Sequence, residues 1–415
     1  MLSVKEAESI ILELVKPLDS QRDTESVKLE EATSRILAQP IASKLNFPYW
    51  DNSAMDGYAV KFVDVQVCSA THPVLLEIIE EIPAGVQPKK VIESKQAARI
   101  FTGAMMPNGA DTIVIQENTK REGDRVSIFS PPSTSKAFVR QQGEFYQAGN
   151  PLLEPGITIN APEIAVLATA QCSQLSVYRR PKVAILSTGD ELVPPDRTPQ
   201  PGQIIDSNQY ALTAFVVSQG AIPLPLGIVP DKLALLKEKI TQAIASADIV
   251  LSTGGVSVGD YDYVDRILAE LGGEIHIRSI AVKPGKPLTV ATFANGCIYF
   301  GIPGNPVSAL VSCWRFVQPA LKKLSGLSGN WLPTFVRARS RDRLISDGKR
   351  ESYVWGQLLL VNGVYEFQVA GGSQSSGNLI NLAQTNGLAV LPVAQTSILS
   401  GQEVEVMQVG NAIAR

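Results

Sequence analysis

The chain has 415 residues with 37 Lys and Arg against 40 Asp and Glu, and a net charge of −3 gives it no general attraction for nucleic acid or anionic lipid. Hydrophobic residues at 45% and charged residues at 19% exclude a disordered chain, and at roughly 150 residues per domain the length corresponds to about three domains. Four cysteines without a Cys-x-x-Cys pair and only two histidines argue against an ordinary zinc site or a disulfide framework, so we expect reduced, mostly buried cysteines.

The N-terminal residues predict an amphipathic helix. Ser3 and Glu6 form a capping-box pattern, and apolar residues over 4–15 repeat at helical spacing until Pro17 ends the run. A second short helix is expected around residues 30–37.

Nothing at the start of the chain resembles a targeting segment, because no apolar stretch typical of a signal peptide follows Met1. Two long uncharged stretches, 207–230 and 287–314, are interrupted by Gly and Pro, as in buried strand–turn–helix units rather than membrane spans. We therefore expect a cytoplasmic protein that does not enter the membrane.

Short β-type runs follow from about residue 46. Gly, Pro and Asn separate these runs, which cover 74–79, 98–101, 112–115 and 125–129. This texture predicts an all-β insert, a small barrel or sandwich. Residues 162–170 look helical again, so the first segment is expected to be one domain that the β insert interrupts.

Residues 178–325 alternate between strands and helices. Strands are expected at 183–186, 222–229, 249–251 and 298–300, and helices at 206–219, 231–245, 262–271 and 307–324. Such alternation predicts a mostly parallel sheet with helices on both faces, a three-layer α/β/α block. After Gly326 the chain returns to β runs. The fold class is thus multidomain α/β plus β, divided into a discontinuous helical domain (1–45 and 146–177), a β insert (46–145), an α/β domain (178–326) and a C-terminal β domain (327–415).

Two predicted strands end in the same triplet. Ser187-Thr188-Gly189 follows the first strand of the α/β block, and Ser252-Thr253-Gly254-Gly255 follows the third. Ligands bind at the carboxyl ends of strands in open α/β sheets, where glycines let backbone N–H groups approach a phosphate. A Gly-rich turn that only reverses the chain is the alternative, and the absence of a G-x-x-x-x-G-K-[ST] pattern excludes a P-loop NTPase.

Carboxylates gather at the same strand ends. Oxygen ligands of this kind suit Mg²⁺, which usually takes one or two carboxylates together with phosphate oxygens. Helix capping is the alternative role, above all for Asp206 and Asp231, which stand where helices begin. The carboxylates concerned are Asp190, Glu191, Asp231, Asp260 and Asp262.

Three further segments are candidates for binding. Lys283-Pro284-Gly285-Lys286-Pro287 presents two lysines on a stiff turn that suits a compact oxyanion, although solvated surface lysines are the default. Gly304-Asn305-Pro306 opens a helix and needs no explanation beyond capping, yet its N–H groups also suit an anion. Asp56 precedes Gly57 in a loop, where Asp is ordinarily a turn residue.

These segments together resemble the molybdopterin molybdenumtransferase family, also called MoeA, which is homologous to the E domain of gephyrin. The resemblance is carried in family order by 52–59, Thr102-Gly103-Ala104, 187–192, 254–263, 283–287 and 303–308, and it spans the whole chain. It implies the last step of molybdenum cofactor assembly, in which molybdenum from molybdate enters adenylylated molybdopterin and AMP is released.

The resemblance also implies roles for residues, with Mg²⁺ as the cofactor and molybdate and adenylylated molybdopterin as substrates. Asp56, Thr102 and Asp262 would be catalytic, and Asp56, Glu191, Asp231 and Asp262 would hold the metal. The substrate-binding positions would be Ser187, Thr188, Gly189, Asp190, Gly254, Gly255, Ser257, Gly259, Asp260, Lys283, Lys286, Pro303, Asn305, Arg350 and Ser376. Lys283, Lys286, Arg350 and Ser376 match positions linked to molybdate or substrate anions, and Arg350 and Ser376 are the looser matches.

As for partners, the resemblance implies a homodimer whose clefts combine the β insert of one chain with the α/β and C-terminal domains of the other. The molybdopterin adenylyltransferase and proteins that mature molybdoenzymes are further expected partners, whereas nucleic acid and membranes are not.

One departure from the family pattern concerns an acidic position. Gly143-Glu144-Phe145 stands where members usually have Gly-Glu-Asp. The metal shell is then one carboxylate short, and the open alternatives are that Glu144 compensates or that the Asp is dispensable. Three alternatives stay open: an ATP-dependent molybdopterin adenylyltransferase, which lacks the flanking β domains, a non-catalytic scaffold, and a paralogue with altered metal choice.

Overall fold

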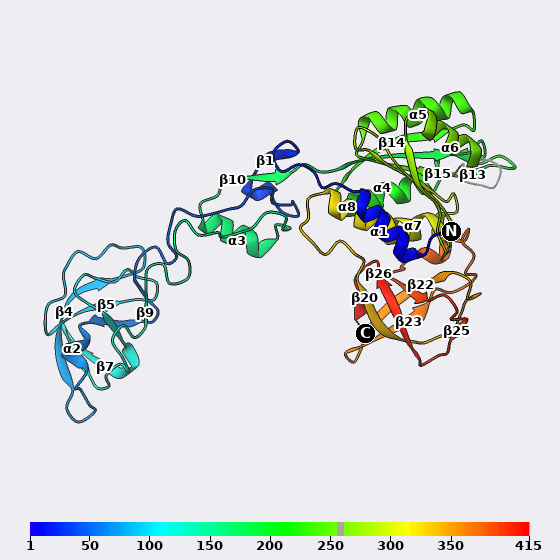
Figure 1. Ribbon diagram of the computed structural model, residues 1–415. Helices are drawn as coiled ribbons and strands as arrows, with labels where there is room; N and C mark the ends of the chain where they lie inside the picture. Colours follow the sequence, from blue (N-terminus) through cyan, green and yellow to red (C-terminus); the bar gives the residue numbers. More distant parts are fainter. Residues whose placement is uncertain (255–260, 415) are drawn as a thin grey trace. The chain divides into compact units, whose positions relative to one another are not determined.

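The computed structural model describes residues 1–254 and 261–414, apart from the side chains of 261–263. The chain divides into two compact units (Figure 1). The first comprises Met1–Gln39, Pro155–Ile164 and Gln174–Arg415, and the second comprises Pro40–Glu154 and Ala165–Ser173. Each unit is described by itself.

A six-stranded sheet forms the centre of the first unit. Its strand order is β14 (Ile222–Val229), β11 (Lys182–Thr188), β15 (Ile249–Thr253), β19 (Ile298–Ile302), β18 (Pro287–Thr292) and β16 (Glu274–Ser279). The first four strands are parallel, as the alternation of strands and helices predicts, and β18 and β16 are antiparallel to their neighbours. Neither β16 nor β18 is among the strands expected from the sequence.

Apolar residues cover both faces of this sheet, since Val183 and Ile185 of β11 belong to one core and Ala184 and Leu186 to another. Helices α1, α4, α7 and α8 contribute to the first core, and α5 and α6 to the second (Figure 1). The helices are α1 (Val4–Leu14), α4 (Asn208–Ser218), α5 (Leu233–Ser246), α6 (Tyr261–Glu270), α7 (Pro306–Ser312) and α8 (Gln318–Leu324). The predicted capping box of Ser3 and Glu6 is present at the start of α1.

Two helix predictions need correction. The helix expected around 30–37 is wrong: a 3₁₀ turn (η1, Leu29–Glu31) is followed by Ser34 at φ 62°, and Ile36 then bridges to Thr158. The left-handed backbone at Ser34 cannot continue a helix. The single helix expected over 307–324 is interrupted by a π-helical segment (η3, Cys313–Val317) between α7 and α8.

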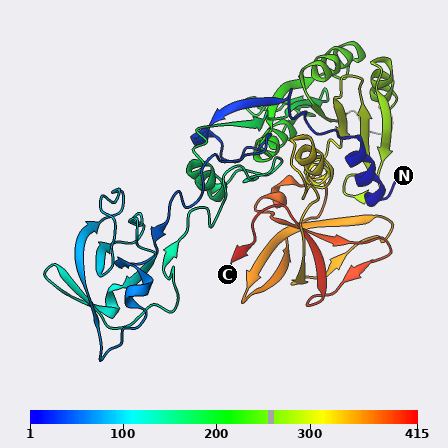
Figure 2. The same ribbon diagram turned by 60° about the vertical axis from the view of Figure 1, so that its left-hand side comes forward.

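The C-terminal part of the first unit is a barrel-like sheet, drawn in orange and red in Figure 2. Strand β22 pairs with both β23 and β24, so the path from β22 through β23, β20, β26 and β24 returns to β22. The strands are β17 (Val282–Lys283), β20 (Phe335–Ser340), β22 (Glu351–Val361), β23 (Val364–Val369), β24 (Gly387–Leu391), β26 (Glu403–Gln408) and β27 (Ile413–Ala414), with the short pair β21 (Leu344–Ile345) and β25 (Ser397–Ile398) and the turn η4 (Leu379–Leu382). Phe367 and Val406 lie in the core that the sheet encloses.

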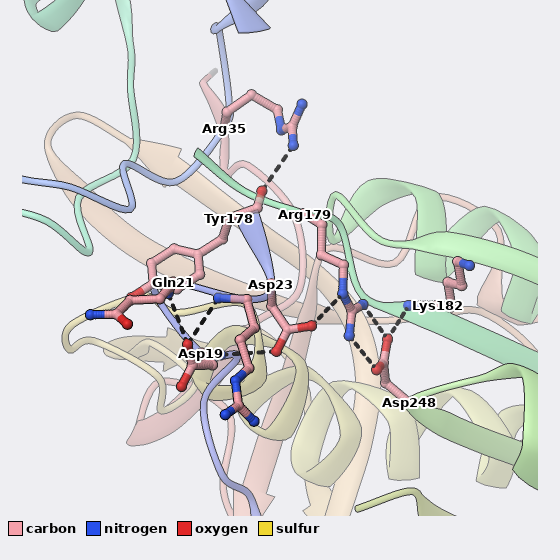
Figure 3. A network of polar contacts seen from close by, with 9 residues as sticks. Asp19, Gln21, Asp23, Arg35, Tyr178, Arg179, Lys182 and Asp248 are labelled. Carbon is pink, nitrogen blue, oxygen red and sulfur yellow. Dashed lines mark hydrogen bonds and ion pairs between the residues drawn. The ribbon is translucent and has the colours of Figure 1, made fainter. Parts of the chain in front are cut away.

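An ion-pair network joins β1 (Thr24–Lys28) and β10 (Gln174–Tyr178) to the central sheet (Figure 3). The guanidinium of Arg179 makes two bonds of 2.8 Å to Asp248 and a third to Asp23, and the N–H of Lys182 donates to Asp248. Asp248 precedes β15 and Lys182 begins β11, so the network fixes the chain where two central strands start.

The second unit contains a six-stranded sheet, as the short β runs predict. Its order is β6 (Thr112–Ile115), β3 (Gly57–Val60), β5 (Gln96–Ile100), β4 (Val74–Ile82), β8 (Arg125–Ile128) and β7 (Thr119–Glu122), and beside it lie β2 (Asn52–Ser53), β9 (Val139–Arg140), α2 (Phe62–Val65) and η2 (Gln116–Asn118). Tyr58 and Ile100 belong to two small cores within this unit. Helix α3 (Ala161–Thr169) crosses the boundary between the units in sequence.

Among the described residues, no helix is both long and apolar enough to cross a membrane. All four cysteines are free thiols, and Cys68, Cys297 and Cys313 are buried, as expected from their number and spacing.

Candidate functional site

The floor of the candidate site is formed by the ends of two neighbouring parallel strands. Ser187 of β11 lies opposite Thr253 of β15, and the buried Thr253 hydroxyl donates to the Ser187 hydroxyl over 3.3 Å. Gly254 follows at φ 85°, and a Cβ on it would lie 2.2 Å from the carbonyl oxygen of Thr188. Only glycine fits there, so the two Ser-Thr-Gly segments are held in direct backbone contact.

A cavity of about 740 Å³ opens over these strand ends, within the usual range for small-molecule sites. It lies entirely within the first unit. Its lining consists of Thr188, Gly189, Glu191, Leu192, Ile204, Ile205, Asp206, Ser207, Asn208, Asp231, Thr253, Gly254, Pro287, Pro303, Gly304, Asn305, Pro306, Gly377 and Leu379. The short pair β12 (Leu192–Val193) and β13 (Ile204–Ile205) supplies an apolar wall.

Predicted metal ligands lie on this cavity. Glu191 and Asp231 both line it, and the backbone N–H of Asp231 donates to the carboxylate of Asp190. Two carboxylates beside a phosphate-sized opening match the donor set that Mg²⁺ takes together with substrate oxygens. No group of three or more His, Cys, Asp or Glu side chains suited to a metal occurs among the described residues. Glu191 and Asp231 are oxygen donors of the type that a magnesium ion takes when substrate oxygens complete its ligands.

Several predicted substrate-binding and metal-binding residues do not line the cavity or lie outside the described residues. Gly255, Ser257, Gly259 and Asp260 lie outside the described residues. Asp262 belongs to the first turn of α6, but its side chain is also outside the described part of the chain. Ser187 is fully buried beneath the floor, and Asp190 is exposed and does not line the cavity.

Asp206 is the main residue of the cavity that sequence analysis did not select. Its side chain is only 2% exposed; Oδ1 accepts a bond from the N–H of Gln209, and Oδ2 has no partner among the described residues. The Thr188 hydroxyl, also buried at the cavity, likewise lacks a partner there. Buried polar atoms are ordinarily bonded, so these two atoms at the cavity are candidates for contact with a ligand or a water molecule. Asp206 was interpreted only as a helix cap; the N-cap residue of α4 is Ser207, and Asp206, one residue earlier, accepts a bond from the N–H of Gln209 in the first turn.

The start of helix α7 is joined by hydrogen bonds to two segments that are distant in sequence. The amide of Asn208 donates to the carbonyl of Gly304 over 2.7 Å, and the amide of Asn305 donates to the hydroxyl of Ser376 over 3.1 Å. The N–H of Val307 also donates to the carbonyl of Ser376. Ser376 therefore lies beside Asn305 at the start of α7, next to a wall of the cavity.

The predicted basic residues Lys283 and Arg350 lie together, and Lys286 follows Lys283 by three residues; these three residues are called the basic cluster. Strand β17 runs parallel to β22, and Nη1 of Arg350 donates to the carbonyl of Val282, which brings Lys283 and Arg350 together. None of the three lines the cavity, although Pro287 does. Lys286 is exposed and forms no ion pair with a described residue.

A carboxylate that sequence analysis missed lies within the basic cluster. Oδ2 of Asp347 is 3.2 Å from Nζ of Lys283 and 3.8 Å from Nη2 of Arg350. The pKa of Asp347 lies below its ordinary value, first because the backbone N–H of Lys349 donates to the carboxylate and then because of Lys283. Asp347 is thus an ionised partner of two predicted anion-binding groups.

In the second unit, Asp56 and Thr102 are in contact. The backbone N–H and the hydroxyl of Thr102 both donate to Oδ1 of Asp56 over 2.7 Å. These two bonds lower the pKa of Asp56 and hold one of its oxygens. Asp56 and Thr102, which the resemblance places together in one cleft, are thus hydrogen-bonded to each other within this unit.

The departure at Phe145 also lies in the second unit. The Phe145 side chain is 67% exposed. The carboxylate of Glu144 accepts a bond from the N–H of Gln141 over 3.0 Å and thereby closes a tight turn. One carboxylate oxygen of Glu144 is therefore engaged within the turn.

Comparisons with known proteins agree along the whole chain. Residues 2–170 match the model of the MoeA N-terminal region (domain I and II), residues 184–323 that of a probable molybdopterin binding domain, and residues 337–409 that of the MoeA C-terminal region (domain IV).

Relatives and a solved structure point the same way. A molybdopterin molybdenumtransferase of Nostoc sp. is 60% identical over 98% of this chain and 94% of its own length, and one of Haemophilus influenzae is 37% identical over 79% and 78%. The crystal structure of a molybdopterin biosynthesis MoeA protein from Pyrococcus horikoshii matches 99% of this chain and 100% of its own with a TM-score of 0.83 at 29% identity. The chain belongs to the molybdopterin molybdenumtransferase (MoeA) family.

Proposed function

We propose that this chain inserts molybdenum from molybdate into adenylylated molybdopterin and releases AMP, the last step of molybdenum cofactor assembly. The observation that carries the proposal is the 740 Å³ cavity at the two Ser-Thr-Gly strand ends, which Glu191 and Asp231 line. Its size suits a nucleotide-like substrate, and its backbone amides and carboxylates suit a metal-bound pyrophosphate.

Within this proposal, the cavity residues hold the phosphate side of the substrate. Backbone groups at Gly189 and Gly254 approach the phosphates, and Glu191 and Asp231, with Asp56 and Asp262, supply oxygen ligands for Mg²⁺. When bound, Mg²⁺ would neutralise charge on the pyrophosphate. Thr188 and Asp206 offer an unpartnered hydroxyl and carboxylate oxygen to the substrate. Thr102 keeps one oxygen of Asp56 engaged and leaves the other available.

The basic cluster receives molybdate in this proposal. Molybdate is a small, strongly hydrated dianion, so a site needs fixed positive charge and hydrogen-bond donors together. Lys283, Lys286 and Arg350 supply both. Lys286 is available without breaking an ion pair to a described residue, whereas Lys283 must leave Asp347.

Further parts of the proposal concern organisation. We take the chain as a cytoplasmic homodimer that works with the molybdopterin adenylyltransferase and with proteins that mature molybdoenzymes. The domains run 1–45 with 146–177, 46–145, 178–326 and 327–415, and the α/β domain has three layers. If sedimentation shows a monomer at a protein concentration at which AMP release is fully active, the homodimer is contradicted.

The function is tested by mixing the purified protein with adenylylated molybdopterin, Mg²⁺ and molybdate. We expect AMP release that depends on molybdate. Consumption of ATP in the presence of unadenylylated molybdopterin, without molybdate-dependent AMP release, would favour an adenylyltransferase instead. Release of AMP without any incorporation of molybdenum into the pterin would also contradict the proposal.

A further inference from the structure

The carboxylate of Asp347 lies between two cations of the basic cluster. Its Oδ2 accepts a bond from Nζ of Lys283 at 3.2 Å and lies 3.8 Å from Nη2 of Arg350. Both distances are within the range of an ion pair, so the carboxylate interacts with the same two cations that would meet a bound oxyanion. One carboxylate of the chain thus occupies the position of an anion.

The turn that carries Asp347 holds this carboxylate in place. Oδ1 accepts a 2.9 Å bond from the N–H of Lys349, and the hydroxyl of Ser346 accepts one from the N–H of Gly348, whose φ is 67°. Arg350 is fixed from the other side by its bond to the carbonyl of Val282. The carboxylate is therefore positioned by the backbone and not only by the cations that it contacts.

We propose that Asp347 is an internal ligand of the oxyanion site and lowers its affinity for molybdate by occupying Lys283 and Arg350. This inference rests on the proposed function, in which the basic cluster binds molybdate. The side chains of Lys283, Asp347 and Arg350 are 47%, 33% and 26% exposed, so an anion in solution reaches all three. An incoming dianion displaces the carboxylate from the cations, and the Lys349 N–H retains it nearby.

The charge of the cluster agrees with this role. Lys283 and Arg350 with Asp347 leave one positive charge, and Lys286, three residues along the chain from Lys283, supplies a second, so that the two together would balance one tetrahedral dianion. Without Asp347 the cluster would carry three positive charges and would bind abundant anions such as sulfate more firmly. Asp347 therefore sets the anion concentration at which the site fills.

The test is calorimetric titration of the intact protein with molybdate alone. In Asp347→Asn the amide keeps the shape and the Oδ1 acceptor but removes the charge. We expect its affinity for molybdate and for sulfate to rise about 1.5-fold to fivefold, the range for one partly exposed ion-pair partner. Asp347→Ala is expected to raise both affinities as well.

Glu403→Gln is the matched control, because it removes one negative charge from a 3.3 Å ion pair with Arg337 elsewhere in the same β region. We expect this variant to bind molybdate as the unaltered protein does. Unchanged or weaker binding in both Asp347 variants would overturn the inference, as would an equal gain in the control.

A Lys283→Ala titration separates this inference from the proposed function. If Lys283→Ala weakens molybdate binding while the Asp347 variants change nothing, only the inference about Asp347 fails. If the unaltered protein releases no AMP with both substrates present, the proposed function fails whatever the titrations give.

Discussion

Gly254→Ala tests the contact between the two strand ends that form the floor of the cavity. Gly254 has φ 85°, and a Cβ at this position would lie 2.2 Å from the Thr188 carbonyl oxygen and 2.7 Å from its hydroxyl. Ordinary contacts of a Cβ begin near 3.4 Å, so about 1 Å of movement between the strand ends is required. The carbonyl belongs to the backbone of a buried strand and cannot rotate away.

The cost has two parts. A non-glycine residue at this φ loses about 1 kcal/mol of the free energy of unfolding, and the steric conflict adds about 1–3 kcal/mol. A shift of about 1 Å in residues that position a substrate reduces rates by about 100-fold. We therefore expect Gly254→Ala to lose about 3 kcal/mol of unfolding free energy and about 100-fold in AMP release.

Gly227→Ala supplies the matched control. Gly227 lies in β14, the neighbour of β11, and has the same φ of 85°, but a Cβ there would meet nothing within 4 Å. This variant should lose only about 1 kcal/mol of unfolding free energy and keep its rate of AMP release. Denaturant unfolding and initial AMP rates are measured for both variants. Equal effects of the two substitutions, or an unchanged rate in Gly254→Ala, would refute the reasoning.

Three further predictions concern buried charges. Burial raises the pKa of Asp248, but the bonds and charge of Arg179 and the N–H of Lys182 together outweigh burial and leave this pKa below its ordinary value. The stabilisation by Asp248 is therefore present above about pH 4 and is lost as the pH falls further. Asp248→Asn should cost about 2 kcal/mol of unfolding free energy at pH 7 and remove this acid dependence in urea unfolding. Asp206→Asn keeps the acceptor for the N–H of Gln209 but replaces the unpartnered carboxylate oxygen with an amide donor. We expect AMP release to fall at least about tenfold at a nearly unchanged Tm. An unchanged rate would mean that Asp206 only caps the helix. Arg315→Met leaves Glu8 as an uncompensated, largely buried carboxylate and should lower the free energy of unfolding by about 3–5 kcal/mol. Adding Glu8→Gln to this variant should restore much of that loss. No recovery in thermal unfolding would contradict the pairing of Arg315 with Glu8.

Local sequence patterns predicted the central strands and the floor of the cavity well. An apolar run followed by Ser-Thr-Gly indicates a buried strand and the turn at its carboxyl end, and both Thr188 and Gly254 lie at the cavity. Glu191 was identified in the same way, because it follows directly after the turn. These signals are local, so a single sequence contains them.

Other parts of the site depend on long-range contacts that no local pattern reveals. Asp347 meets Lys283 only because β17 pairs with β22 in one particular register. The burial of Asp206 depends on how the helix after it packs, and a capping residue on the surface has the same sequence signal. Ser34 ends the expected helix at 30–37 through a left-handed backbone that the residue type does not predict.

The most direct test of the account compares the dependence of AMP release on molybdate in Lys286→Ala and Glu191→Gln. Lys286 is assigned to molybdate and Glu191 to the metal-bound phosphates. The loss of AMP release in the two variants must therefore respond differently to added molybdate. Lys286→Ala should require more molybdate for half-maximal AMP release and recover most of its rate in excess molybdate. Glu191→Gln should stay slow at every molybdate concentration. Rescue of Glu191→Gln by molybdate, or failure to rescue Lys286→Ala, would contradict the division of the site into a phosphate-binding cavity and an oxyanion-binding basic cluster.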